Sequence, residues 1–380
     1  MSVTALIVAA GKGERLGGGL PKQYRPLGGK PVLRRAVEAL ASHPAIGALR
    51  VVIGAGQHDL ANEALAGLDV GPLIEGGAER ADSVRAGLGQ IASDVVLVHD
   101  AARPFCPPAV IDRLLAPLEF FDGAAPVLAV GDTLARAGDQ IETPVDRSGL
   151  VRVQTPQAFR LGALRRAYES WSGQAATDET TVVRAAGLGV AAVEGDPALE
   201  KITTTADFAR AEQWLAARLV SRTGVGFDVH AFADNGPIMM GGIEIPHERG
   251  LAGHSDADVV LHAITDALLG AAGLGDIGEF FPPADPQWKG ASSDRFLAHA
   301  ATLVRELGGV IDNVDCTVIC EAPKVAPHRE QMRARIAEIL RVRQSQVNIK
   351  ATTTERLGFT GRGEGIAAQA VANIRLEMSE

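Results

Sequence analysis

The stretch Thr4-Ala-Leu-Ile-Val-Ala-Ala-Gly11-Lys-Gly13-Glu-Arg15 decides the fold of the first part of this chain. Its apolar run predicts a strand buried on both faces, as in a parallel sheet. Glycines after such a strand let backbone N–H groups approach phosphate oxygens, and basic side chains can neutralise phosphate charge. The glycine spacing fits neither a Walker A loop nor a dinucleotide fingerprint. We interpret the stretch as a nucleoside triphosphate loop; a tight turn with solvated charges stays open as an alternative on these residues alone.

Short apolar runs alternate with helical stretches as far as about residue 218. This alternation predicts βαβ units, an α/β fold with a Rossmann-like, mostly parallel sheet, and ligands at the C-terminal ends of the strands. Residues 132–157 interrupt the rhythm, and we expect a projecting arm that pairs with another subunit. The expected strands are 6–9, 51–53, 95–98, 125–130 and 190–193, and the expected helices are 31–41, 80–91 and 108–118.

A second domain follows the first after a short linker. We expect a helix at 206–219 to close the first domain and residues 221–224 to form the linker, which gives domains 1–220 and 221–380. The second domain mixes strands and helices, which predicts an α+β fold. Its expected strands are 316–320 and 347–350, and its expected helices are 256–270, 294–307, 325–340 and 365–376.

Composition excludes several classes of protein. The formal net charge of −9 argues against a general nucleic-acid binder, which needs a basic surface. No apolar run is long enough for a membrane span, and the N-terminus lacks a signal-peptide pattern. With an odd count of three cysteines, these features predict a cytoplasmic protein. Cys316 and Cys320 fit core packing better than metal binding, because no second cysteine pair follows.

The segments Gly226-Phe-Asp228-Val-His230 and His254-Ser255-Asp-Ala-Asp-Val-Val-Leu-His262 form a second signature. Asp228 and His230 are two residues apart in an extended segment, so their side chains point the same way. With His262 they form a catalytic zinc set that leaves one position open for a substrate oxygen. Taken alone, a helical histidine is more often structural.

The helix that carries His262 also carries acidic residues at four-residue spacing. We expect Ser255 to cap this helix, with Asp258 as the acid of a capping box. Asp258 or Asp266 can then accept the other imidazole N–H of His262.

Further motifs follow the first loop in order. They are Gly76-Gly-Ala-Glu-Arg80-Ala-Asp-Ser83, His99-Asp100-Ala-Ala-Arg103-Pro, Thr155-Pro-Gln157, Thr177-Asp-Glu179 and Leu199-Glu-Lys201. With them, the first domain resembles the 2-C-methyl-D-erythritol 4-phosphate cytidylyltransferases over essentially its whole length. The resemblance implies a nucleotidyltransferase domain that joins CTP to methylerythritol phosphate, with Mg²⁺ held chiefly by the triphosphate.

The same resemblance implies roles for single residues. Arg15 and Lys22 would stabilise the transition state at the α-phosphorus of CTP, and Lys201 would also be catalytic. The nucleotide would contact Ala9, Ala10, Gly11, Gly13, Gly77 and Ser83. The acceptor phosphate and the ribose side would contact Asp100, Arg103, Thr155, Thr177 and Lys201. From the arm, Thr133 and a catalytic Arg147 would reach a neighbouring subunit's site. Asp100 as a turn cap and Arg147 in a surface salt bridge stay open as alternatives.

The second domain continues with its own motifs, Asp276-Ile-Gly278, Phe280-Phe-Pro282, Ala322-Pro-Lys324, Lys350-Ala-Thr-Thr-Thr-Glu355 and Gly358-Phe-Thr-Gly-Arg362-Gly-Glu364. It resembles 2-C-methyl-D-erythritol 2,4-cyclodiphosphate synthase over nearly its whole length. By that resemblance, Zn²⁺ on Asp228, His230 and His262 polarises the β-phosphate, and Mg²⁺ near Glu355 bridges the diphosphate. The substrate's 2-phosphate then attacks the β-phosphorus and CMP leaves.

The second resemblance also assigns contacts. His254 and Ser255 would position the phosphate, with His254, Thr353 and Glu355 as catalytic residues. Asp276 and Gly278 would bind the erythritol hydroxyls, and Phe359 and Arg362 would lie near a trimer axis. CMP would contact Ala322, Pro323, Lys324, Thr353 and Thr354. Lys324 as a solvated surface lysine stays open, and Pro283 departs from the acid expected there.

The whole chain therefore resembles a fusion of two enzymes whose reactions are not consecutive. The second reaction needs a 2-phosphate that the first does not make, and the chain has no ATP-kinase loop. A separate ATP-dependent kinase is the expected metabolic partner, and the families imply a homo-oligomer, a trimer or hexamer. Alternatives are a nucleotidyltransferase that uses another nucleotide, fused to a zinc-dependent lyase, and a non-catalytic sensor of cytidine nucleotides.

Overall fold

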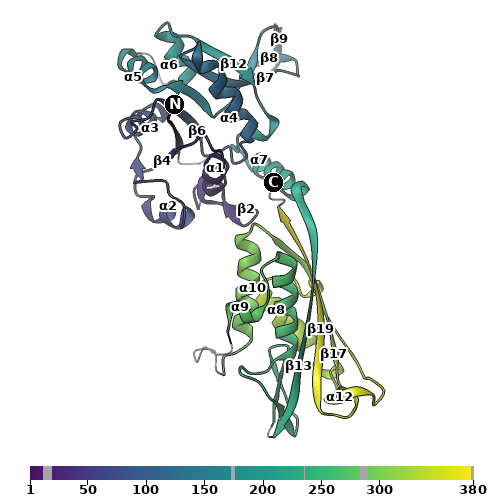
Figure 1. Cartoon of the computed structure of the whole chain (residues 1–380). Helices are drawn as coiled ribbons and strands as arrows, with labels where there is room; N and C mark the ends of the chain where they lie inside the picture. Colours follow the sequence, from purple (N-terminus) through teal and green to yellow (C-terminus); the bar gives the residue numbers. More distant parts are fainter. Residues whose placement is uncertain (12–18, 173–175, 235, 283–289, 378–380) are drawn as a thin grey trace. The chain divides into compact units, whose positions relative to one another are not determined.

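The computed structural model describes residues 1–11, 19–172, 176–234, 236–282 and 290–377 (Figure 1). Contacts divide the chain into two compact units, Met1–Gln213 and Trp214–Glu380. This division falls inside helix α7 (Thr205–Arg218), and the domain boundary at 220/221 stays a prediction. Within the described ranges, no helix combines the length and apolarity needed to cross a membrane.

The first unit is built on an eight-stranded, mostly parallel sheet. β1 pairs in parallel with β4 on one side and β6 on the other, so its residues are almost all buried. β10 and β11 run antiparallel to their neighbours. The order is β10-β7-β11-β6-β1-β4-β5, with β12 beside β7. The bounds are Val3–Ala9 (β1), Ala48–Ile53 (β4), Ile74–Glu75 (β5), Val95–Asp100 (β6), Gly123–Ala129 (β7), Val151–Val153 (β10), Gln157–Arg160 (β11) and Val190–Glu194 (β12).

Helices cover both faces of this sheet, as the alternation of strands and helices predicts (Figure 1). Successive β1 residues face opposite layers: Ile7 belongs to the core formed with α1 and α4, and Leu6 to the core formed with α3, α5 and α6. All five expected strands and three expected helices are confirmed. The helices are Val32–Ala41 (α1), His58–Ala64 (α2), Arg80–Leu88 (α3), Pro108–Leu115 (α4), Leu161–Ser170 (α5) and Glu179–Ala185 (α6), with 3-10 turns at Lys22–Tyr24 (η2), Ala116–Glu119 (η3) and Pro197–Leu199 (η4).

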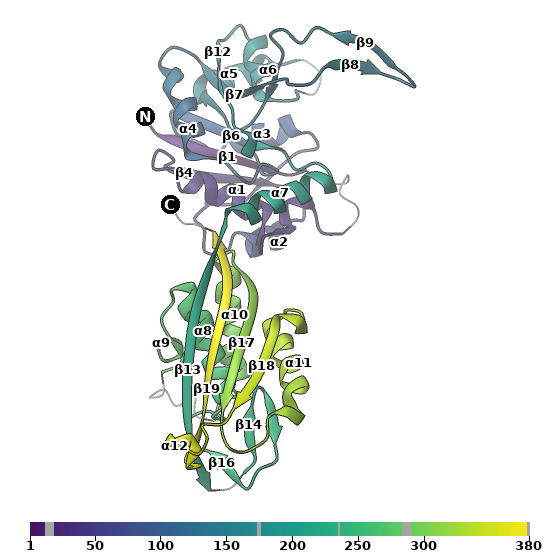
Figure 2. The same ribbon diagram turned by 90° about the vertical axis from the view of Figure 1, so that its right-hand side faces the viewer.

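Only the first part of the expected arm projects. β8 (Leu134–Ala137) and β9 (Ile141–Val145) form an exposed hairpin that extends away from the sheet (Figure 2). The rest of the segment returns to the sheet as β10 and β11. A smaller hairpin joins β2 (Pro26–Leu27) to β3 (Lys30–Pro31).

The second unit is an α+β fold, as expected, with its main helices on one side of a five-stranded sheet (Figure 1). The order is β16-β13-β19-β17-β18, and β14 and β15 form a separate hairpin. The strands are Leu219–Asp234 (β13), Ile238–Met240 (β14), Ile243–Ile245 (β15), Arg249–Leu251 (β16), Val310–Ile319 (β17), Val347–Thr352 (β18) and Gly365–Glu377 (β19). The helical segments are Val259–Ala272 (α8), Ile277–Phe280 (α9), Asp294–Glu306 (α10), Ala326–His328 (η6), Arg329–Leu340 (α11), Gln344–Gln346 (η7) and Gly358–Gly361 (α12).

Two expectations for the secondary structure of the second unit are wrong. The helix expected at 365–376 is strand β19, whose side chains enter the core at every second residue from Ile366 to Leu376. Its alanines favour a helix, but the two-residue period of its apolar side chains fits a strand. The linker expected at 221–224 is part of β13, where Ser221 pairs with Arg375 and Gly224 with Ala372.

Candidate active sites

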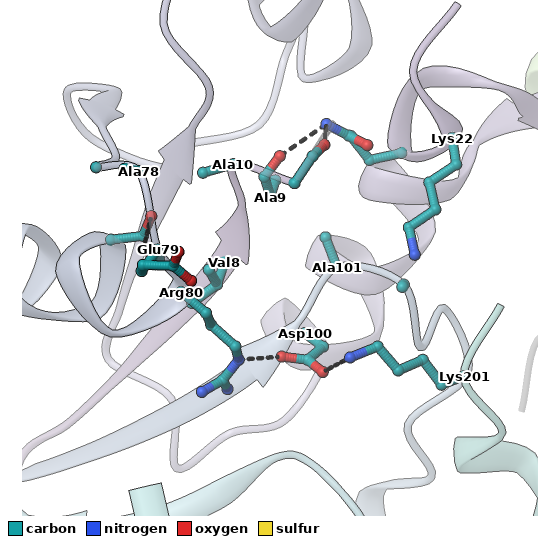
Figure 3. A pocket seen from close by; sticks show the side chains of 15 residues that line it. Val8, Ala9, Ala10, Lys22, Ala78, Glu79, Arg80, Asp100, Ala101 and Lys201 are labelled. Carbon is teal, nitrogen blue, oxygen red and sulfur yellow. Dashed lines mark hydrogen bonds and ion pairs between the residues drawn. The ribbon is translucent and has the colours of Figure 1, made fainter. Parts of the chain in front are cut away.

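The first cavity lies at the C-terminal ends of β1 and β6, where an open α/β sheet binds its ligands (Figure 3). The start of α3 and Lys201 complete its wall. The structure brings together eight of the predicted site residues here: Ala9, Ala10, Gly11, Lys22, Gly77, Ser83, Asp100 and Lys201.

Asp100 ends β6 and binds a cation with each carboxylate oxygen. Its Oδ2 lies 2.6 Å from Nζ of Lys201, and its Oδ1 lies 3.0 Å from Nε of Arg80 (Figure 3). Burial alone would raise the pKa of Asp100, but Arg80 and Lys201 outweigh it and hold the pKa far below its usual value. The carboxylate is therefore ionised at any physiological pH.

Arg80 is itself fixed by Glu179, which is fully buried at the start of α6. The two terminal guanidinium nitrogens donate to the two carboxylate oxygens of Glu179, at 2.6 and 3.0 Å. Tyr168 donates a further hydrogen bond to Glu179 at 3.0 Å. Such a bidentate pair holds the guanidinium in one plane, so Arg80 presents a fixed Nε to Asp100.

Thr155 supports the Asp100 backbone rather than lining the cavity. Its hydroxyl accepts the N–H of Asp100 at 3.0 Å and lies 3.2 Å from Nδ1 of His99. The other ring nitrogen of His99 lies 2.9 Å from the carbonyl of Arg103. One proton arrangement satisfies every group: Thr155 donates to Nδ1, and Nε2–H donates to Arg103. Burial lowers the pKa of His99 to about 4, which keeps the ring neutral.

The loop after β1 is anchored by the residues that follow it. The side-chain amide of Gln23 donates to the carbonyls of Ala9 and Gly11, at 2.7 and 3.0 Å. Nζ of Lys22 donates to the carbonyl of Ile202 at 2.9 Å, which holds the ammonium at the cavity wall.

Four further predicted residues do not line this cavity in the described part of the chain. Arg103 donates to the carbonyl of Leu199, and its buried Nε meets no partner among the described residues. Thr177 is exposed beside α6. Thr133 and Arg147 are exposed on the arm, where Arg147 donates to the carbonyl of Gly131. Gly13 and Arg15 lie outside the described residues.

Sequence reasoning gave no role to Arg80, Glu179 and Gln23. Arg80 and Glu179 stand inside motifs that the sequence displays, but 99 residues separate them, so nothing in their spacing indicates that they pair. Gln23 follows Lys22 directly, in a segment whose fold only the structure reveals.

In the second unit, Asp228, His230 and His262 converge to form a candidate metal centre. Asp228 and His230 project from the same face of β13, and His262 comes from α8. Oδ2 of Asp228 lies 3.0 Å from Nε2 of His230 and 2.9 Å from Nδ1 of His262, and those two nitrogens are 3.2 Å apart.

The donor set fits a divalent metal ion. Two imidazole nitrogens and one carboxylate oxygen form a ligand set that zinc favours, with room for an exogenous ligand. The other nitrogen of His230, Nδ1, lies 2.8 Å from the carbonyl of Ala252. A carbonyl only accepts, so Nδ1 carries the proton and Nε2 has its lone pair free for a metal.

The expected capping of α8 is wrong. Asp258 itself is the N-cap, and its carboxylate accepts the N–H groups of Val260 and Leu261. The same carboxylate accepts from Gly241 and Gly242, so it is not free for His262. The expected role of Asp266 is also wrong, because Nε2 of His262 lies against Ser255 and Ser293, while the carboxylate of Asp266 accepts the N–H of Ile277. The short polar side chains of Ser255 and Ser293, rather than an acid, lie against the second nitrogen of His262.

An apolar-walled cavity adjoins the metal centre. Its wall includes three predicted residues besides the ligands, His254, Ser255 and Gly278, and two aromatic rings, Phe281 and Phe296. Asp276 caps α9 by accepting the N–H groups of Gly278 and Glu279, which fixes the Gly278 backbone at the wall.

The other predicted residues gather in loops at the same end of the sheet. β17 and β18 are parallel, so the segments after Ile319 and Thr352 leave side by side, and Glu321 accepts the N–H of Thr354. The first loop holds Ala322, Pro323 and an exposed Lys324. In the second, Thr353 donates to Glu355 at 2.8 Å. Phe359 is 38% exposed on α12, and Arg362 pairs with Glu364.

Comparisons with known proteins agree with this geometry. The family model for 2-C-methyl-D-erythritol 4-phosphate cytidylyltransferase matches residues 3–217, and that of the YgbB family matches residues 221–375. A bifunctional enzyme IspD/IspF from Rhizorhabdus wittichii is 59% identical over 99% of this chain and 98% of its own. That of Rhodospirillum rubrum is 53% identical over 98% of this chain and 99% of its own.

A solved structure extends the likeness to three dimensions. The bifunctional IspDF from Campylobacter jejuni is 34% identical, covers 99% of both chains and has a TM-score of 0.50. Family match, identity and coverage point the same way across both units, and this chain belongs to the family of bifunctional IspD/IspF enzymes.

Proposed function

We propose that the first unit transfers the cytidylyl group of CTP to 2-C-methyl-D-erythritol 4-phosphate and releases pyrophosphate. The observation that carries this proposal is the cavity at the ends of β1 and β6, where Arg80 and Lys201 pair with Asp100 and Lys22 lines the wall. The family match over residues 3–217 supports the substrate assignment.

Within this reaction, the residues that line the cavity have tasks that their positions support, and the family match suggests the tasks of the others. The backbone of Ala9, Ala10 and Gly11 and the small residues Gly77 and Ser83 leave room for the nucleotide. Lys22, with Arg15, stabilises the charge that develops on the α-phosphate. Asp100 and Lys201 orient the acceptor, assisted by Arg103, Thr155 and Thr177. Mg²⁺ would be held mainly by the triphosphate.

The second unit, in our proposal, converts the 2-phosphate of CDP-methylerythritol to methylerythritol 2,4-cyclodiphosphate and CMP. Asp228, His230 and His262 would hold Zn²⁺ or another divalent ion, which when bound makes the β-phosphate a better electrophile. His254, Ser255 and Gly278 line the wall against which the substrate is held. Ala322, Pro323, Lys324, Thr353 and Thr354 would bind the CMP portion, and Glu355 would contact Mg²⁺.

The assembly is also part of the proposal. The exposed β8–β9 hairpin, which carries the apolar Ile141 and Val145, suits pairing with a second copy of the first unit. Exposed Val225, Phe227 and Val229 on β13 suit self-association of the second unit, with Phe359 and Arg362 near its axis. We propose a homo-oligomer, a trimer or hexamer, that works in the cytoplasm alongside a separate ATP-dependent kinase.

A product assay on the purified full chain tests both activities. CTP, methylerythritol phosphate and Mg²⁺ should give pyrophosphate and the cytidylylated product. The phosphorylated intermediate should give the cyclic diphosphate and CMP, and a chelator should stop this second reaction. Turnover with another nucleotide in place of CTP would favour a different nucleotidyltransferase, and tight CTP binding without any product would favour a sensor.

A further inference from the structure

The outer nitrogen of His262, Nε2, faces a chain of polar groups made of the buried Ser293 and the half-buried Asp256. Oγ of Ser293 lies 2.8 Å from it, and Ser293 is fully buried. The same Oγ makes a short hydrogen bond to Oδ1 of Asp256, and the N–H of Ser293 donates to Oδ2 at 3.0 Å. The backbone of Asp256 is held by a hydrogen bond from its N–H to the carbonyl of Ala291, at 3.1 Å. Asp256, Ser293 and His262 thus form one connected chain.

The hydroxyl of Ser293 is placed where it serves no structural need of its own helix. Ser293 is the N-cap of α10, a position where serine normally bonds the first turn. Here its side chain makes no such capping bond and is turned toward Asp256 and His262 instead. A cap of this kind is worth about 1 kcal/mol in other proteins, so its loss indicates that the hydroxyl serves another contact.

Counting protons along this chain fixes the state of the ring. A carboxylate only accepts, so the bond between Ser293 and Asp256 uses the single hydroxyl proton of Ser293. Ser293 can then only accept from His262, so Nε2 carries the proton. Nδ1 is left with a lone pair, and this is the nitrogen that faces Asp228 and His230. Without the chain, Asp228 at 2.9 Å would draw the proton to Nδ1, where it blocks a metal.

We propose that Asp256 and Ser293 are positioning residues that hold His262 in its metal-binding tautomer and fix the plane of its ring. The inference deepens the proposed metal site and rests on it. In His230, the metal-binding tautomer is held by the carbonyl of Ala252, so different groups fix the tautomers of the two histidine ligands. Ser255 makes a weaker contact with Nε2, at 3.2 Å, and its oxygen also accepts from Ala257.

Metal binding by the full-length protein tests the proposal directly. Co²⁺ is titrated into chelator-treated protein, and its absorption bands and competition with a chromogenic chelator give the affinity. Ser293→Ala and Asp256→Asn should each weaken binding about 10- to 100-fold, the usual cost of removing an outer-shell partner of a metal ligand. Asp256→Asn keeps the shape but offers an amide donor, which frees the Ser293 proton to point at Nε2 and favours the wrong tautomer. Ser292→Ala is the matched control, because the Ser292 hydroxyl donates to the neighbouring Asp294 at 2.7 Å and, among the described residues, makes no hydrogen bond to Asp256 or His262. This variant should bind Co²⁺ like the wild type.

The double variant Asp256→Asn/Ser293→Ala separates positioning from general damage. If Asp256 acts through Ser293, the double variant loses no more affinity than the worse single variant, whereas independent effects would multiply. His262→Ala tests whether Co²⁺ binds at the proposed site, because loss of this ligand should remove the Co²⁺ absorption bands. Failure of His262→Ala to weaken binding would overturn the metal site itself. Weakening by His262→Ala, with wild-type affinity in both Ser293→Ala and Asp256→Asn, would overturn this inference alone.

Discussion

Lys22 is the residue of the first site whose geometry most directly suggests a role in the transition state. Its ammonium lies at the cavity wall, held by the carbonyl of Ile202, while Asp100 engages the other two cations. Its ammonium is therefore held on the wall of the cavity that we propose binds the triphosphate. A preorganised charge of this kind acts most strongly when negative charge grows during attack.

We expect Lys22→Ala to lower kcat for cytidylyl transfer about 10²- to 10³-fold, with a smaller rise in the KM for CTP. Steady-state kinetics with CTP as the varied substrate measure both constants. Lys30→Ala is the control, because Lys30 forms an ion pair with Glu38 at 2.9 Å and does not line the cavity. An unchanged kcat in Lys22→Ala would assign this lysine to ground-state binding.

His99 makes the first unit sensitive to acid. Its pKa is about 4 in the folded chain, because it is fully buried, and about 6.5 when exposed. Between these values, unfolding takes up a proton, so the free energy of unfolding falls as the pH drops. At pH 5, the loss is about 2 kcal/mol relative to neutral pH.

Hydrogen exchange of peptides from β6 can measure this loss, after correction for the intrinsic exchange rates. The wild type should lose protection between pH 7 and pH 5 by about that amount. His99→Gln cannot titrate, so its lower protection should show a smaller change over the same pH range. Equal pH dependence in the two proteins would contradict a neutral, buried His99.

At the scale of elements, the approach of β13 to α8 sets the metal centre. Gly226 lies two residues before Asp228, and a Cβ there would meet the carbonyl oxygen of Ala263 at 2.0 Å, next to His262. Only glycine lets strand and helix come this close, and this closeness brings His262 to the two ligands on β13.

Gly226→Ala should therefore push β13 from α8, weaken Co²⁺ binding by at least tenfold and destabilise the second unit by about 1–3 kcal/mol or more. Co²⁺ titration and thermal unfolding check the two effects. Gly270→Ala is the control on α8 itself, because, apart from its own helical turn, no atom of the described residues lies within 4 Å of the added Cβ. Wild-type affinity in a folded Gly226→Ala protein would show that this contact does not position the ligands.

Much of this element plan could be predicted from the sequence, and the failures have physical causes. The buried runs of the first sheet stand out because both faces of each strand are apolar. In β19 half of the apolar side chains are alanine, so helix propensity hides the alternation, which pairing with β13 and β17 decides.

The candidate sites were also predictable only where a local pattern reveals the residues. Asp228, His230 and His262 were predictable, because strand spacing and helix position put them on facing surfaces. The partners of these residues were not: Asp256 reaches His262 through Ser293, 37 residues further along the chain, and Arg80 reaches Glu179 across 99 residues. Contacts over such separations depend on how whole elements pack, and no local pattern encodes them.

At the scale of the whole molecule, the two candidate sites share no residue within the described ranges. One is built on the first unit and the other on the second. We expect His262→Ala to abolish formation of the cyclic diphosphate while cytidylyl transfer stays within about twofold of the wild type, since chemically independent sites lose activity separately. Both product assays on one preparation measure this, and comparable loss of both activities in folded protein would contradict independence.

The exposed arm allows the assembly to be tested through activity. If Arg147 on the β8–β9 arm serves a neighbouring subunit's site, then Lys22→Ala and Arg147→Ala damage the same site from different chains. Each variant alone should transfer cytidylyl groups poorly. In an equal mixture that has dissociated and reassociated, about half of the pairs contain one copy of each variant, and one of the two sites in such a pair holds neither change. The mixture should therefore recover about one quarter of wild-type activity.

The control is a mixture of two variants that damage the cavity of their own chain. Recovery should vanish when Lys22→Ala is mixed with Lys201→Ala, because both of these residues line the cavity of their own chain. Activity in the first mixture that stays at the level of the separate variants would place Arg147 outside the neighbouring site, and the arm would then need another role.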